Sequence, residues 1–313
     1  MSRMHKPGKR LLFILLATVM LAAAPVLWYF LLHGGPGDSI PLDGTPDPAL
    51  AGQSAQVHVI DVGQGDAVLL EQGGEYALID TGTPASREAL TFYLDAHGVR
   101  ELKYLVLTHF HADHIGGALS VLENFRVKTV LLPDLELAPM PTAYTALELL
   151  EALEKRAATG KLQVLLPTVG DRFALGAAEL TVLGSGIPCA EDANNTSLIT
   201  LFTFDNFRYF SAGDAEAEAE AELLTRMDAV RADLYKASHH GSSTSSTQAL
   251  VDMLQPKAAA ISCGAGNDYG HPHTEITQRL LAAGARLWRT DFEGSILFTV
   301  KDGVLQVRPE KRG

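Results

Sequence analysis

Four potential metal ligands lie within six residues near the middle of the sequence. His109, His111, Asp113 and His114 follow a strand-like apolar run at residues 102–107. A loop at the end of a strand can direct several side chains at one point, and imidazole nitrogen with carboxylate oxygen suits Zn²⁺, Mn²⁺ or Fe²⁺. His109 and His111 can chelate one ion, whereas Asp113 and His114 can face a second ion. This spacing predicts a metal site rather than a solvated loop that happens to be rich in histidine.

The elements that must position these ligands are a mixture of strands and helices. The sequence predicts strands at residues 102–108, 127–132, 162–166, 171–175, 178–184 and 207–214, and helices at residues 86–97, 114–124, 143–159 and 215–227. Hairpin signals occur in each half of the chain. This pattern fits two sheets that are flanked by helices.

Length and charge narrow the function. The chain has 313 residues, 47% of them hydrophobic, and a formal net charge of −12. The first 33 residues contain four basic residues and no acidic one, so the acidic excess lies in the remainder. An acidic body argues against a broad phosphate-binding surface for nucleic acid. A local site in which metal ions supply the positive charge remains compatible with this composition.

The N-terminal 33 residues have the composition of a membrane anchor. Residues 11–32 are apolar and uncharged, and a helix of that length extends about 33 Å, enough to span a bilayer core. Lys9 and Arg10 precede the span, which predicts a cytoplasmic N-terminus and an extracytoplasmic body. A signal peptide cleaved after residues 22–24 would instead release a secreted protein. Residues 34–55 are rich in glycine and proline and are expected to form a linker.

Several motifs occur in an order that resembles a known family. They are DVGQGDA (61–67), LIDTG (78–82), THFHADHIGG (108–117), NNTSL (194–198), SAGD (211–214), HHGSSTS (239–245), SCGAGNDYGHPH (262–273) and RTDFEGS (289–295). The HxHxDH pattern resembles the metallo-β-lactamase-fold hydrolases. The combination resembles the metallo-β-lactamase-like domain of the ComEC/Rec2 competence proteins, without their multi-span channel portion. The resemblance implies an α/β (α+β) αββα sandwich over residues 56–308, preceded by one transmembrane helix, with a two-metal site at one edge.

The resemblance also assigns roles to two carboxylates. Asp80, in the DTG turn, would support the metal loop without binding a metal itself, although an aspartate beside a glycine is also a common turn residue. Asp214 would bridge two ions, because its two oxygens can bind one ion each. Capping of the helix that follows is the alternative role for Asp214, and the two roles are compatible.

The remaining polar groups complete the predicted site. One of the paired histidines can join Asp113, His114 and Asp214 at the second ion, and the other can face the substrate or protonate a leaving group. We favour His239 as the ligand and His240 as the substrate-facing group, and the reverse order stays open.

Further candidates lie in three other segments. Lys236 and His271 are additional candidates to stabilise the leaving oxygen. Relatives of this fold often place a third histidine after His114, but the sequence has none before His239. Asn194 or Asn195 could take that place through an amide oxygen or a water, or could simply form a turn.

These observations predict a metal-dependent hydrolase with two divalent ions, Zn²⁺ or Mn²⁺. The predicted activity is that of an extracytoplasmic phosphodiesterase or nuclease of ComEC/Rec2 type that acts on DNA, with Asp113, Asp214, His240 and Lys236 as catalytic residues. The alternatives are a cell-wall phosphodiesterase of the phosphorylcholine-esterase type and a non-catalytic metal-binding module. The expected partners are the membrane, DNA or another phosphodiester, and a competence channel protein.

Overall fold

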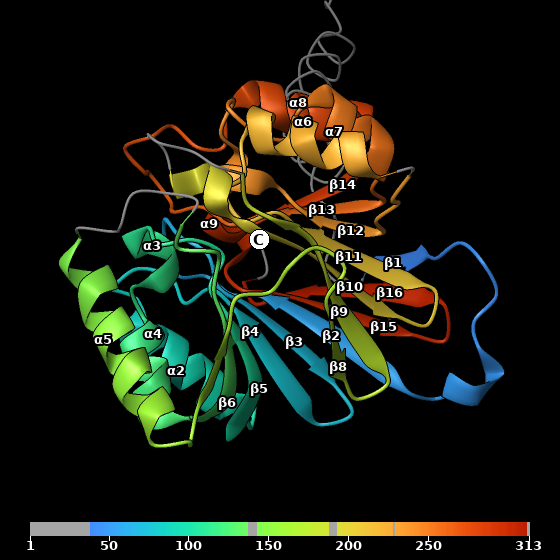
Figure 1. Cartoon of the computed structure of the whole chain (residues 1–313). Helices are drawn as coiled ribbons and strands as arrows, with labels where there is room; N and C mark the ends of the chain where they lie inside the picture. The colour runs from blue at the N-terminus through green and yellow to red at the C-terminus, as the bar shows by residue number, and fades with distance from the viewer. Residues whose placement is uncertain (1–37, 137–142, 188–192, 228, 312–313) are drawn as a thin grey trace, which may run out of the picture. The chain divides into compact units, whose positions relative to one another are not determined.

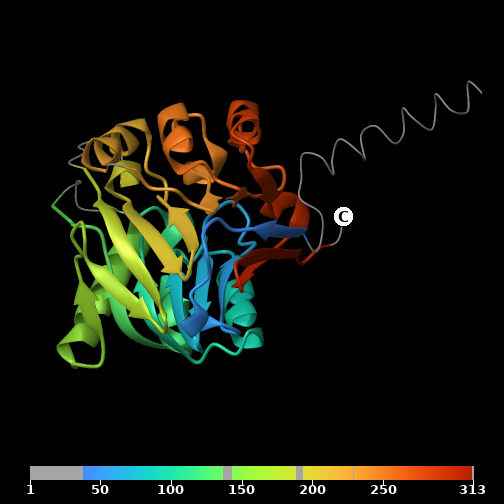
Figure 2. The ribbon, with the colours of Figure 1, turned by 90° about the vertical axis from the view of Figure 1, so that its right-hand side faces the viewer.

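Two β-sheets packed face to face, with helices on both outer faces, form the body of the protein (Figure 1). The computed structural model describes residues 38–136, 143–187, 193–227 and 229–311, which all belong to the unit Pro36–Gly313. Figure 2, turned by 90°, shows the same succession of helices, sheets and helices. The predicted αββα sandwich is therefore confirmed.

The first sheet contains nine strands within the described residues. In pairing order they are β1 (Asp38–Pro41), β16 (Val304–Pro309), β15 (Ile296–Lys301), β2 (Ser54–Val59), β3 (Val68–Gln72), β4 (Glu75–Ile79), β5 (Glu101–Val106), β6 (Arg126–Leu131) and β7 (Gln163–Leu165). The pairs from β1 to β4 are antiparallel, whereas β4 to β7 run parallel.

The second sheet has seven strands within the described part of the chain and repeats this division. In pairing order they are β14 (Arg286–Arg289), β13 (Ala258–Ile261), β12 (Leu234–Lys236), β11 (Phe207–Ser211), β10 (Leu198–Phe204), β9 (Ala178–Ser185) and β8 (Arg172–Leu175). Strands β11 to β14 are parallel, and β8 to β11 are antiparallel. Each sheet thus has a parallel half, whose strands all end at one edge.

Helices cover the outer faces, and short helical turns occupy the loops. They are α2 (Arg87–Ala96), α3 (Ala112–Ile115), α4 (Ala118–Asn124), α5 (Tyr144–Ala158), α6 (Ala217–Arg226), α7 (Gln248–Leu254), α8 (Thr274–Ala282) and α9 (Thr290–Glu293), with 3₁₀ turns η1 (Pro48–Leu50), η2 (Ala193–Thr196) and η3 (Ser238–Gly241). Figure 1 shows α2, α4 and α5 on the side of the first sheet and α6, α7 and α8 on the side of the second.

The period-2 pattern of the strands produces separate hydrophobic layers. In β2, Val57 and Val59 pack between the two sheets with side chains such as Phe202 and Trp288 of the second sheet. His58, on the opposite face of the same strand, lies beside Tyr93 of α2. Two further clusters fix the outer helices, one under α2, α4 and α5 and one under α6, α7 and α8. Each sheet is therefore held rigidly on both faces.

The N-terminal boundary of the fold differs from the prediction. The stretch predicted as a linker, residues 34–55, contributes strand β1, which pairs with β16 from Asp38 to Pro41. The folded body thus begins before residue 56, because a strand as short as β1 has too few residues to give a periodic signal. Within the described residues, no helix has the length and apolar character to cross a membrane. The span predicted at residues 11–32 lies outside those residues.

Candidate metal centre

The predicted ligands come together where the parallel strands end. Asp80 follows β4, the HxHxDH loop follows β5, Asp214 follows β11, and the histidine pair follows β12. Loops at the carboxyl ends of parallel strands meet at one edge of a sheet. Because the two sheets lie face to face, both sets of loops reach the same place.

Four side chains from these loops form a candidate metal-binding cluster. The ligand atoms of Asp113, His114, Asp214 and His240 all lie within 4.8 Å of one another. His240 Nε2 is 3.2 Å from Asp113 Oδ2 and 3.4 Å from Asp214 Oδ2, and His114 Nε2 is 3.1 Å from the same Asp214 oxygen. Three of the four are buried, and Asp113 is one-third exposed.

The chemistry of this cluster fits a divalent cation. Two carboxylates and two imidazoles are a nitrogen and oxygen donor set suited to Zn²⁺ or Mn²⁺. Asp214 Oδ1 is buried and has no hydrogen-bond partner among the described residues. A buried carboxylate oxygen without a partner is costly, and a bound cation would satisfy it.

Without a cation, protons balance the charge of the cluster. Burial alone would lower the pKa of His114, but Asp214 and Asp80 outweigh it and hold the pKa well above its usual value. The pKa of His240 is raised in the same way, against burial, by Asp214 and Asp66. Burial would raise the pKa of Asp214, but the two imidazoles hold it well below its usual range. The metal-free cluster therefore carries two imidazolium groups at neutral pH.

Asp80 lies behind the cluster and orients it. One carboxylate oxygen accepts a hydrogen bond from Thr108 N at 2.8 Å. The other accepts from Thr108 Oγ1 at 2.7 Å and from His114 Nδ1 at 2.8 Å. These contacts direct His114 Nε2 towards the cluster, which is how a carboxylate outside the ligand set supports a metal-binding histidine.

His109 and His111 lie beside the cluster but outside it. His109 Nε2 is 3.1 Å from His111 Nδ1, and the rings of His109 and His114 are 4.1 Å apart. Burial, together with the charge of His114, lowers the pKa of His109 well below its usual value, so this imidazole is neutral. A neutral imidazole such as that of His109 is suited to bind a cation.

The structure favours the reverse of the roles predicted for the histidine pair. His240 is buried in the cluster, and its Nδ1 donates to Ser262 O at 3.0 Å. His239 Nε2 is 3.9 Å from Asp214, while its Nδ1 contacts Thr244 Oγ1 at 3.1 Å. Both residues adopt positive φ, 50° for His239 and 54° for His240, which turns the two rings in different directions. His240 therefore has the position of a ligand, and His239 lines the cavity.

Lys236 does not reach the site in the way that was predicted. Its side chain is 1% exposed and forms an ion pair with Asp66, which is also buried. Asp66 Oδ1 lies 3.4 Å from His240 Nδ1, so this pair stands behind the ligand. The position is incompatible with a direct contact to a leaving group. Asp66 was not predicted as a site residue, because its partner Lys236 is far away in the chain.

The loop at residues 194–197 supports the site where relatives often have a third histidine. Asn195 Oδ1 accepts from Glu216 N at 2.9 Å, so this amide holds the start of the next helix. Asn194 instead lines the cavity. Ser197 Oγ accepts from Asp214 N at 3.1 Å and lies 3.3 Å from His109 Nδ1. Asp214 does not cap α6, because the N-cap residue of that helix is Glu216.

A cavity of about 340 Å³ opens onto the cluster. Besides the ligands it is lined by Gln64, His239, Tyr269 and His271. Gln64 Nε2 is 3.3 Å from His271 Nδ1, and burial lowers the pKa of His271 to about 4. His271 is therefore neutral and lies in the cleft. Gln64 and Tyr269 belong to recognised motifs, but their residue types gave no chemical signal.

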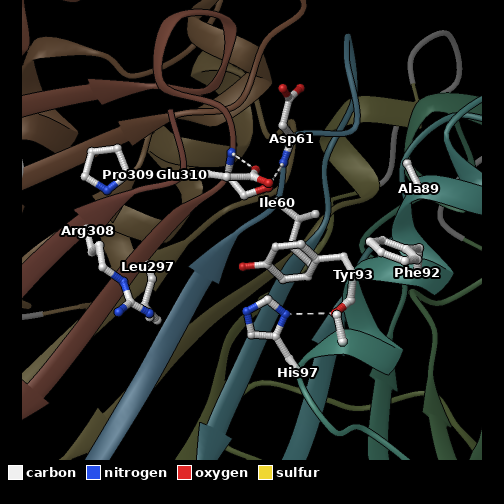
Figure 3. Close-up of a pocket in the computed structure, with 12 residues that line it drawn as sticks. Ile60, Asp61, Ala89, Phe92, Tyr93, His97, Leu297, Arg308, Pro309 and Glu310 are labelled. Atoms are coloured by element: carbon white, nitrogen blue, oxygen red, sulfur yellow. Dashed lines mark hydrogen bonds between the residues drawn. The ribbon is translucent and has the colours of Figure 1, made fainter. Parts of the chain in front are cut away.

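A larger cavity, about 520 Å³, lies beside α2 (Figure 3). Tyr93 and His97 stack at one wall with their ring centroids 4.1 Å apart, and Arg308 lies at another. The candidate metal-binding cluster includes none of the residues that line this larger cavity. The smaller cavity is therefore the candidate reaction site.

The comparisons with known proteins agree with this geometry. Residues 60–265 match the family model described as the metallo-beta-lactamase superfamily. ComE operon protein 3 of Bacillus subtilis is 31% identical over 276 residues, which cover 82% of this chain and 34% of that protein. Competence protein ComA of Neisseria gonorrhoeae is 27% identical over 259 residues, covering 82% and 34%. The chain thus spans about a third of the length of these relatives.

A solved structure shares the fold. The metallo-beta-lactamase fold protein YhfI from Bacillus subtilis matches with a TM-score of 0.54 at 12% identity, over 79% of this chain and 100% of that one. At this identity the likeness concerns the arrangement of elements alone.

Substitution of each paired histidine separates their roles. We expect His240→Ala to weaken Zn²⁺ binding by more than about 100-fold, because it removes a donor from the cluster, and His239→Ala to change it by less than about threefold. A competition titration against a chromophoric chelator measures both affinities on the full-length protein. A larger loss of Zn²⁺ affinity in His239→Ala than in His240→Ala would show that His239 is the ligand.

The raised pKa values of His114 and His240 make metal binding compete with protons. At pH 7 both imidazoles are protonated in the metal-free protein, so binding should release up to about two protons per ion, and affinity should rise with increasing pH. Calorimetry in buffers of different ionisation enthalpy counts the released protons. Binding at pH 7 without proton release would contradict this charge assignment.

Proposed function

Because the chain belongs to the metallo-β-lactamase superfamily, we propose that it is a metal-dependent phosphodiesterase that hydrolyses DNA outside the cytoplasm. The observation that carries this proposal is the cluster of two carboxylates and two imidazoles on the wall of an open, polar cavity. A divalent cation bound there would polarise a phosphoryl oxygen and supply a hydroxide at neutral pH.

The surrounding residues hold this cluster in one geometry. Asp80 fixes His114 through its Nδ1, and Ser262 O fixes His240 through its Nδ1. Both imidazoles therefore present Nε2 to the same point. Such preorientation lowers the barrier, because the donors need no rearrangement during reaction.

His271 is the cavity residue suited to contact the phosphoryl group. Its Nδ1 faces the Gln64 amide, which leaves the ring proton on Nε2. A neutral imidazole in this state can donate a hydrogen bond to a phosphoryl oxygen. Lys236 acts instead as a positioning residue, because its ammonium neutralises Asp66 behind His240.

The proposed site holds two ions, Zn²⁺ or Mn²⁺. Asp113, His114, Asp214 and His240 would hold one ion. His109 and His111 would hold the other with Asp214 between the two, an arrangement supported by the contact between the rings of His109 and His114. Two adjacent cations are the usual device for stabilising the attacking and leaving oxygens of a phosphodiester.

DNA is the proposed substrate because of the named relatives. One of them is named competence protein ComA, and another is named ComE operon protein 3. On this basis a competence channel protein is the proposed partner. The acidic body is compatible with this role if bound cations provide the local positive charge.

Hydrolysis tests the proposed chemistry. The Mn²⁺-loaded full-length protein should cleave single-stranded DNA and bis-p-nitrophenyl phosphate. Asp214→Ala should lower kcat/KM for both by more than about 100-fold, equivalent to about 3 kcal/mol of barrier. Tyr144→Ala, on the exposed face of α5, is the matched control. Hydrolysis that survives Asp214→Ala would show that another site, or a contaminant, does the chemistry.

The proposed extracytoplasmic location rests on residues 1–33. We propose that residues 11–32 anchor the protein, because they are apolar and follow a basic segment. Protease added to intact cells or spheroplasts should digest the body, and the chain should resist extraction by alkaline carbonate. A protease-protected body in intact spheroplasts would contradict this location.

A further inference from the structure

Tyr269 is an exposed aromatic side chain at the mouth of the metal cavity. It is 68% exposed, and among the described residues it is the one strongly exposed large hydrophobic side chain that lines this cavity. Because the ring is exposed, it does not contribute to the packing of the hydrophobic core. Its face is available to a ligand.

The ring of Tyr269 packs against a second ring of the cavity. It stacks on His271, with ring centroids 5.6 Å apart and an interplanar angle of 22°. The ring of His271 lies in turn 6.2 Å from that of His240 in the metal cluster. A single imidazole therefore separates the exposed ring from a proposed metal ligand.

Asn267 holds the loop that carries both rings. Its Oδ1 accepts hydrogen bonds from Tyr269 N at 3.2 Å and His271 N at 3.0 Å. Its Nδ2 donates to Gly264 O at 2.9 Å and His271 O at 2.7 Å. Four hydrogen bonds from one side chain fix the loop backbone, so the platform exists before a ligand binds.

The cavity lacks the groups that usually bind phosphates. No lysine or arginine is among the described residues that line it, although Asp113 and Asp214 are. The protein as a whole carries a net charge of −12. Electrostatic attraction between the side chains of the cavity and a phosphate backbone is therefore weak, and substrate affinity beyond the contribution of bound cations must come from another contact.

We propose that Tyr269, seated on His271, is a stacking platform for a nucleobase next to the phosphodiester that the site cleaves. This inference rests on the proposed phosphodiesterase function and adds the contact by which the site would bind a base of a single-stranded nucleic acid. A base can lie on an exposed ring only when it is unstacked from its neighbours, which is the state of a single strand. Stacking on an aromatic side chain tolerates any base, so we expect this contact to bind single strands without sequence specificity.

A pair of oligonucleotides that differ only in their bases tests the platform. One is a short single-stranded thymidine oligomer, and the other has the same length and phosphates but no bases. Cleavage by the Mn²⁺-loaded full-length protein gives kcat and KM for each. Fluorescence anisotropy with the same labelled oligomers and protein in EDTA gives Kd without cleavage.

The wild-type protein should show KM and Kd lower by about 5- to 100-fold for the oligomer with bases. Tyr269→Ala should raise the KM and Kd of the oligomer with bases to those of the abasic oligomer, and this effect should persist at high salt. Tyr269→Phe should retain the preference. Tyr144→Ala removes an equally exposed tyrosine that does not line the cavity and should have no effect.

An unchanged KM and Kd in Tyr269→Ala would overturn the platform, as would equal binding of the two oligomers by the wild-type protein. Hydrolysis of bis-p-nitrophenyl phosphate is measured in parallel to separate the two proposals. Hydrolysis of this diester without a preference for the oligomer with bases would contradict the platform and support the phosphodiesterase function. If binding prefers the oligomer with bases, and this preference depends on Tyr269 although no diester is hydrolysed, the platform is supported and the phosphodiesterase function is contradicted.

Discussion

The geometry of the metal centre depends on one buried carboxylate, that of Asp80. This residue ends β4 with a positive φ of 58°, and its two oxygens accept hydrogen bonds from Thr108 and His114. A buried carboxylate is costly unless all its acceptors are used, and here three donors come from the ligand loop itself. The same contacts that stabilise Asp80 therefore fix the ring that faces the cation.

The backbone around Asp80 tightens this coupling. Thr81 N donates to His114 O at 2.7 Å, and Gly82 O accepts from Gly116 N at 2.9 Å. A Cβ at Gly116 would collide with the backbone of Pro84, so only glycine lets the two loops approach. The ligand loop is thus fastened to the turn before it, and a displacement of either would move His114.

Much of the architecture follows from local sequence patterns, whereas the finer roles do not. The HxHxDH spacing was enough to predict a metal site, and the strand and helix patterns were enough to predict a mixed α/β fold, whereas the position of the site at one edge was implied by the resemblance to the metallo-β-lactamase-fold hydrolases. The choice between His239 and His240 was not predictable, because it depends on two successive residues with positive φ, a conformation that only long-range contacts stabilise. The burial of Lys236 was not predictable for a related reason, because its partner Asp66 lies in the loop between β2 and β3, far away in the chain.

Those long-range contacts come from helix α6 and from strand β12 of the second sheet. Glu220 of α6 is buried and accepts hydrogen bonds from Ser246 N and Thr247 N at 2.6 and 2.8 Å, and Tyr235 Oη contacts Ser238 and Ser246. They hold both ends of the loop that carries the histidine pair. Left-handed backbone costs about 1–2 kcal/mol per residue, so a loop with two such residues needs anchors of this kind. The strain at the pair is therefore balanced by a carboxylate and a hydroxyl network outside the metal centre. For this reason the position of His240 in the candidate cluster depends on contacts from α6 and β12 as well as on its local motif.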